Sequence, residues 1–142
     1  MNLNFTIKEL CNSDVAKKYK INNTPSIKVC DNLLLLITRV LQPLRDKLCK
    51  PMIITSGYRC EKLNTLIGGV SNSQHLTGQA VDFIVNDMNI NDLFRFIKNS
   101  GIIYDQLIEE HSKNKKWIHI SYSLKNRREN LKYLDGKYIK VV

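Results

Sequence analysis

Two histidines and one aspartate, His75, Asp82 and His119, have the residue types of a metal-binding site. Two neutral imidazoles and one carboxylate bring a single negative charge to a dication, so the site stays net positive. A catalytic zinc ion uses three such ligands, leaves one position for water, and lowers the pKa of that water toward about 7. We therefore predict that these side chains hold one Zn²⁺ ion.

The spacing of these residues leaves other interpretations open. His75 and Asp82 are seven residues apart, so on one straight strand they would lie on opposite faces. Gly78 between them lets the chain turn, which allows His75 to lie on a loop and Asp82 on the following strand. The pair fits equally well as polar surface structure, and His119 fits a hydrogen-bonded histidine at a sheet edge.

A hydrolase also needs a general base, and two glutamates end the strand predicted before His119. If the hairpin pairs Glu110 with Trp117, Glu110 shares the face of His119 and lies diagonally from it, within side-chain reach. A shift of one residue in register would select Glu109 instead. Glu110 is the predicted base and Glu109 the alternative, while both also fit solvated charges of a hairpin.

Arg59 follows a Ser-Gly turn at the end of a predicted strand. Its guanidinium is a fixed fork that can hold a carboxylate or stabilise the negative charge of an oxyanion. A surface salt bridge is the alternative interpretation.

The elements that must position these side chains follow from the hydrophobic pattern. Apolar residues recur at three- and four-residue steps from Ser26 to Leu44, which predicts a long helix that Pro43 kinks or divides. The whole pattern indicates an α+β fold, with N-terminal helices packed on a small, mainly antiparallel sheet. Helices are expected at 15–19, 61–67 and 89–99, strands at 52–55, 79–85, 102–110 and 117–122, a hairpin at 133–142, and extended or loop structure at 4–10, 70–77, 111–116 and 126–130.

Composition limits the class of protein. The 142 residues suit one domain, 1–142, and the first ten residues do not resemble a signal peptide. The longest apolar run is far shorter than the roughly 20 residues of a membrane span. The net charge of +9 fits attraction to an anionic cell envelope, but the basic residues are too dispersed to predict nucleic-acid binding. We expect a monomer with no membrane partner, and four reduced cysteines.

Four segments together resemble a known family. They are similar to the zinc D-Ala-D-Ala carboxypeptidases, peptidase family M15, in the compact branch common in phages and bacteria. The resemblance covers about residues 3 to 123. The segments are S-G-Y-R at 56–59, S-Q-H-L-T-G-Q-A-V-D at 73–82, Q-L-I-E-E at 106–110 and W-I-H-I-S at 117–121.

The resemblance implies a Hedgehog/DD-peptidase-like fold and assigns roles to individual residues. It implies His75, Asp82 and His119 as zinc ligands, Arg59 as the arginine that stabilises the transition state, and Ser73 as a residue lining the substrate site. Some members place a glutamate three residues before the last histidine, where this chain has Lys116. The Q-L-I-x-E pattern of the compact branch instead implies Glu110 as the base, in agreement with the hairpin argument.

The implied activity is zinc-dependent hydrolysis of peptidoglycan stem-peptide bonds involving D-amino acids, by a carboxypeptidase or an endopeptidase. An endolysin-like phage enzyme fits: it would be made in the host cytoplasm without a signal peptide, and would act at the cell wall after release or as part of the virion. The alternative function is a non-catalytic, metal-containing module that binds the wall or serves a structural role in the virion. The sequence leaves open which bond is cut.

Overall fold

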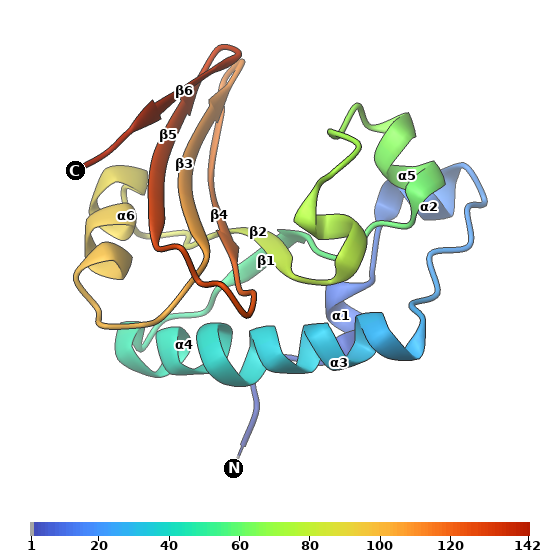
Figure 1. The fold of residues 1–142 in the computed structure, drawn as a ribbon, viewed down its shortest axis with the longest axis horizontal. Helices are drawn as coiled ribbons and strands as arrows, with labels where there is room; N and C mark the ends of the chain where they lie inside the picture. The colour runs from blue at the N-terminus through green and yellow to red at the C-terminus, as the bar shows by residue number, and fades with distance from the viewer. Residues whose placement is uncertain (1) are drawn as a thin grey trace.

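The long helical region of the chain is built from three consecutive segments. The computed structural model describes residues 2–142, and in it α3 (Ile27–Leu36), the π-helical turn η1 (Ile37–Leu41) and α4 (Gln42–Leu48) run on end to end (Figure 1). The N–H of Gln42 bonds to the carbonyl of Ile37, one residue farther back than in an α-helix. α4 begins at Gln42, and Pro43, which lacks an N–H, lies in its first turn, so the helix is divided next to this proline as predicted.

Six strands form one sheet in the order β1-β2-β4-β3-β5-β6. All neighbouring strands are antiparallel except β3 and β5, which run parallel, so the predicted α+β fold with a mainly antiparallel sheet is confirmed. The strands are β1 (Ile53–Ser56), β2 (Ala80–Ile84), β3 (Gln106–Ser112), β4 (Lys115–Ser121), β5 (Glu129–Leu134) and β6 (Lys137–Lys140).

Shorter helices surround the sheet. Serine, threonine and asparagine side chains cap the first turns of all but one of them, because a side-chain oxygen accepts from a backbone N–H that has no partner within the helix. The helix that begins at Glu61 follows Cys60 and has no side-chain cap. Ser13, for example, accepts from the N–H of Ala16 at the start of the helix predicted at 15–19. These elements are α1 (Ile7–Leu10), α2 (Asp14–Lys18), α5 (Glu61–Leu66), the 3₁₀ turn η2 (Gln74–Thr77) and α6 (Ile90–Lys98).

Several predicted boundaries are wrong. The segment 4–10 contains the helix α1, which the side chain of Thr6 caps by accepting from the N–H of Glu9. Residues 102–105 precede β3 rather than belonging to it, and β5 begins inside the segment 126–130 predicted as a loop. The predicted six-residue hairpin loop is only Lys113 and Asn114, because the polar residues on either side pair across the two strands.

The two faces of the sheet differ in what covers them. Phe83, Leu107 and Ile118 point to the face covered by α3, α4 and α6, and all three are fully buried. Burying each large apolar side chain contributes about 1.5–3 kcal/mol, so this face is a rigid support. The polar site residues alternate with them and point to the opposite face.

Two expectations from composition concern membrane-spanning helices and cysteines. None of the helices within residues 2–142 has the length and apolar character needed to span a bilayer. The four cysteines, all in this range, are unpaired thiols, as predicted.

Candidate metal centre and active site

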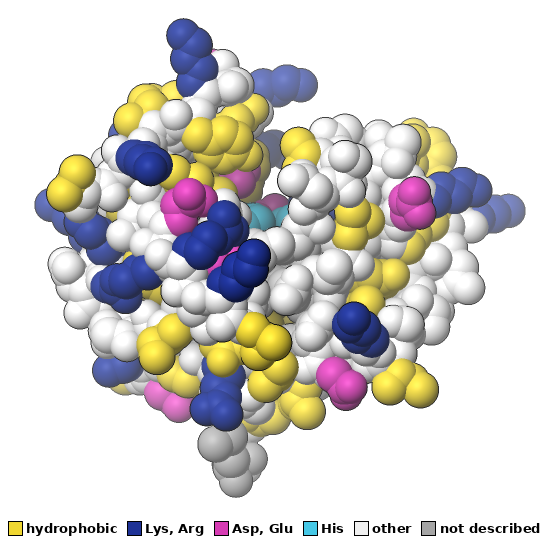
Figure 2. Space-filling model, viewed as in Figure 1, with side chains coloured by type: hydrophobic (Ala, Val, Ile, Leu, Met, Phe, Trp, Pro, Cys, Tyr) yellow, Lys and Arg dark blue, Asp and Glu magenta, His cyan; other side chains and the backbone are white. Residues whose placement is uncertain are grey.

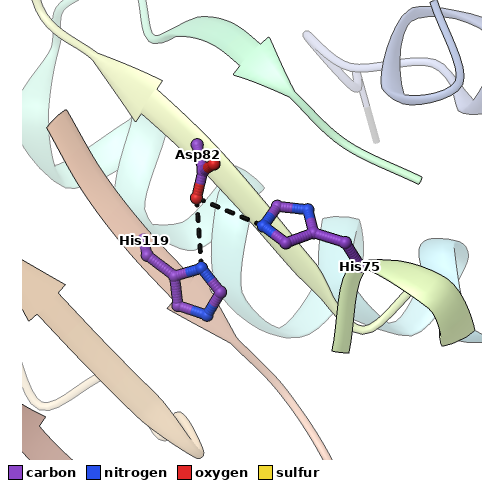
Figure 3. A group of neighbouring side chains, drawn as sticks. All are labelled: His75, Asp82 and His119. Carbon is purple, nitrogen blue, oxygen red and sulfur yellow. Dashed lines mark hydrogen bonds and ion pairs between the residues drawn. The ribbon is translucent and has the colours of Figure 1, made fainter. Parts of the chain in front are cut away.

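Three side chains from separate elements converge on one point. His75 comes from η2, Asp82 from the middle of β2, and His119 from β4, where it lies opposite Asp82 (Figure 3). Asp82 Oδ1 lies 3.3 Å from His75 Nε2 and 3.1 Å from His119 Nδ1. All three residues are buried, and one ligand atom of each lies within 4.8 Å of the others. They could therefore bind a metal ion.

The protonation of His75 follows from its second contact. Its Nδ1 lies 2.8 Å from the carbonyl oxygen of Gly57, which can only accept, so Nδ1 carries the proton. Burial lowers the pKa of His75, although the charge of Asp82 acts in the opposite direction. A neutral ring with a proton on Nδ1 turns the lone pair of Nε2 toward Asp82. A cation held between Nε2 and the Asp82 carboxylate would satisfy both acceptors.

The distances fit a tetrahedral zinc ion. Ligands about 2.0–2.1 Å from zinc at the tetrahedral angle lie about 3.4 Å apart, close to the separations of Asp82 from the two histidines. Burial alone would raise the pKa of Asp82, but the two histidines outweigh it and hold the pKa below its usual range. The carboxylate is therefore ionised and ready to bind a cation.

The odd spacing of His75 and Asp82 has a local explanation. The chain makes the single 3₁₀ turn η2 and leaves it through Gly78, which has φ +73°. This left-handed conformation suits glycine, and a Cβ at this position would lie 2.8 Å from the carbonyl oxygen of Val29. The prediction that the chain turns at Gly78, with His75 before the strand and Asp82 on it, is confirmed.

Glu110 lies on the site face of the sheet. The hairpin pairs Glu110 with Trp117, the register that the sequence argument assumed, so Glu110 lies diagonally from His119. Burial, and next the charge of Asp82, raise the pKa of Glu110 to about 7. The charges of His119 and Arg59 act in the opposite direction.

Glu109, the alternative base, points to the other face of the sheet. It is buried there, 2.5 Å from Nε2 of His111 and 3.5 Å from Nζ of Lys132. The sheet separates its carboxylate from the three candidate ligands. The geometry therefore favours Glu110, and the assignment of the base remains a prediction.

Arg59 is held by three neighbours beside the candidate ligands. Its Nε donates to Ser56 Oγ at 3.1 Å, Nη1 to Asn64 Oδ1 at 3.2 Å, and Nη2 to Asp82 Oδ2 at 3.4 Å. Asn64 was not among the predicted site residues, and its buried amide also donates to the carbonyl of Val70. Because Arg59 contacts the outer oxygen of Asp82, its guanidinium lies next to the metal position.

Ser73 is the N-cap of η2, and its hydroxyl oxygen accepts from the N–H of His75. The hydroxyl hydrogen stays free for another acceptor, so a contact with substrate remains a prediction. The next residue, Gln74, donates to Asp105 at 2.8 Å, and Asp105 also accepts from Nε and Nη2 of Arg127. This link was not predicted. It fixes η2, and with it His75, to the chain between β4 and β5.

The site opens to solvent in a hollow. Figure 2 shows histidine and acidic atoms at the bottom of a depression between the side that carries β3–β6 and the side that carries α5. A ligand can therefore reach the metal position from outside.

The comparison with known proteins gives one family. A family model described as Peptidase M15 matches residues 3–121, which include every candidate site residue. The search of curated proteins gave no match.

Proposed function

The chain belongs to the Peptidase M15 family, and we propose that it is a zinc-dependent peptidase that hydrolyses stem-peptide bonds of peptidoglycan involving D-amino acids. Membership of the family makes the protein a metallopeptidase, and three of its residues could bind a metal. The observation that carries the proposal is the convergence of His75, Asp82 and His119 on the sheet face that also presents Glu110.

Zinc held by His75, Asp82 and His119 would supply a Lewis acid and would lower the pKa of water. The protein supplies the proton transfers. Glu110 accepts a proton from the attacking water and returns it to the leaving amine, which suits a carboxyl whose pKa is about 7. The Arg59 guanidinium, fixed by Ser56 and Asn64, stabilises the oxyanion that develops on the substrate carbonyl.

Mass spectrometry of purified peptidoglycan digested with the zinc-loaded protein tests this proposal. The expected products carry a new amine and a new carboxylate on either side of a bond that involves a D-amino acid. Release of free D-Ala would identify a carboxypeptidase, and separation of linked peptides an endopeptidase. Peptidoglycan that binds the protein but stays intact would contradict the proposal and favour the non-catalytic module.

A separate binding experiment bears on where the protein acts. We propose the bacterial cell wall, reached after release from a host cell or as part of a virion. The net charge of +9 supports binding to an anionic envelope. Binding to wall fragments that weakens as salt increases is the expected result.

A further inference from the structure

Two tyrosines lie beside Glu110 on the neighbouring strands of the sheet. β5 lies parallel to β3 and places Tyr133 opposite Glu110, and β6 places Tyr138 opposite Tyr133. Residues paired in this way point to the same face, so both rings lie on the face of Glu110. β5 and β6 follow residue 121, where the family match ends. The hairpin therefore lies outside the residues that the family model matches.

The two rings form a platform that is open to solvent. Their centroids are 4.8 Å apart with planes at 56°, and Tyr138 is 58% exposed. Burial, and after it the charge of Glu110, raise the pKa of the Tyr138 phenol, and Asp82 contributes in the same direction. The strand pairings place this phenol on the same sheet face as Glu110.

We propose that the Tyr133–Tyr138 platform binds an aliphatic side chain of the substrate on the amine side of the scissile bond. This inference rests on the proposed function. A base that gives its proton to the leaving amine must lie within hydrogen-bond reach of that amine. Glu110 lies between the metal ligands on β2 and β4 and the tyrosines on β5 and β6. The substrate residue that carries the amine consequently extends past Glu110 onto the rings.

The charges around the platform select an apolar group. Lys140 pairs with Leu131, and Lys115 with Ser112, so both lysines lie on the same sheet face as the tyrosines and disfavour a cation. Glu110, opposite Tyr133, disfavours an anion. The exposed face of Tyr138 gains most from covering methyl or methylene groups.

Kinetics on a matched pair of peptides test the platform. The peptides carry D-alanine or glycine on the amine side of the bond that the wild-type protein cleaves. The kcat/KM of wild type should be about fourfold higher for the D-alanine peptide, because burying one additional methyl group stabilises the complex by that factor. Tyr138→Ala should raise KM for the D-alanine peptide about 5- to 20-fold, keep kcat within about twofold, and remove the preference. Tyr138→Phe should behave as wild type.

Ile139→Ala is the matched control, because Ile139 lies next to Tyr138 on β6, points to the opposite face and is 49% exposed. Calorimetric titration of both peptides into zinc-loaded Glu110→Gln, with and without Tyr138→Ala, should give the same loss of affinity without turnover. The inference would be overturned if Tyr138→Ala and Ile139→Ala raised KM for the D-alanine peptide equally. It would also be overturned if Tyr138→Ala raised KM equally for the D-alanine and glycine peptides. Wild type that cleaves no peptidoglycan would instead refute the proposed function.

Discussion

The Nδ1 atom of His75 lies 2.8 Å from the carbonyl oxygen of Gly57, in the turn that also leads to Arg59. This contact selects the tautomer in which Nε2 faces Asp82 with a lone pair. The turn after β1 therefore orients a candidate metal ligand and also presents the candidate oxyanion-stabilising arginine. The segment from Ser56 to Arg59 therefore contributes both to the orientation of His75 and to the placement of Arg59.

Gly57→Ala should disturb both functions of this turn. A Cβ at Gly57 would lie 2.0 Å from the carbonyl oxygen of Leu10, so the backbone must move. We expect zinc affinity to fall about 10- to 100-fold, as when a partner of a metal-bound histidine is lost. Zinc titration measures this. Gly68→Ala is the control for backbone strain away from the site: Gly68, unlike Gly57, has a positive φ, and a Cβ there meets no atom within 4 Å. Equal zinc affinities of the two variants would contradict the role of Gly57.

Removing a candidate metal ligand should abolish zinc binding, whereas removing the histidine outside the site should not. His119→Ala leaves two ligands, and we expect zinc bound in stoichiometric amounts by wild type to be lost on dialysis. His111→Ala is the matched control, because His111 lies on the other face of the sheet beside Glu109. Elemental analysis after dialysis measures both. Zinc retained by His119→Ala, or lost by His111→Ala, would refute the assigned ligand set.

Glu110 should lower the free energy of unfolding of the metal-free protein at neutral and higher pH. Its pKa is raised from 4.5 to about 7 in the folded state, so folding favours the protonated form. The resulting penalty is absent below about pH 4 and grows as the pH rises toward 7. Glu110→Gln should therefore raise the free energy of unfolding at pH 8 by roughly 2 kcal/mol, and by nothing at pH 4. Urea denaturation at both pH values, with chelator present, measures the difference. A variant less stable than wild type at pH 8 would contradict this account.

Asp105 should show the opposite dependence on pH. The hydrogen bonds from Arg127 are the main reason that the pKa of Asp105 lies below its usual range. The ionised form therefore stabilises the fold above about pH 4, and this contribution is lost as the pH falls through the lowered pKa. Asp105→Asn should reduce the free energy of unfolding by about 2 kcal/mol at pH 7 and by much less near pH 2. A pH-independent difference would show that the charge is not involved.

The sequence predicted which polar side chains lie together better than it predicted the boundaries of the elements around them. Hydrophobic periodicity identified the long helix, and the residue types identified His75, Asp82 and His119, which the structure brings together. The hairpin register was assumed rather than derived, because a shift of one residue exchanges Glu109 and Glu110 between the two faces.

Other features depend on tertiary pairing that a single sequence does not specify. Polar residues such as His111 and Ser112 belong to β3 because β4 pairs with them, not because of their own propensity. The parallel contact of β3 and β5 joins segments separated by a whole strand and a loop, so the position of Tyr133 beside Glu110 could not be read from spacing. The contact between Asp105 and Gln74 is likewise long-range.

The most direct test of the central claim is the rate at which zinc-loaded Glu110→Gln hydrolyses purified peptidoglycan, measured beside wild type with and without chelator. We predict that the variant retains its zinc and loses about 10²- to 10⁴-fold in rate, and that chelation abolishes wild-type turnover. Wild-type rates in the zinc-loaded variant, or turnover that chelation leaves unchanged, would contradict the account.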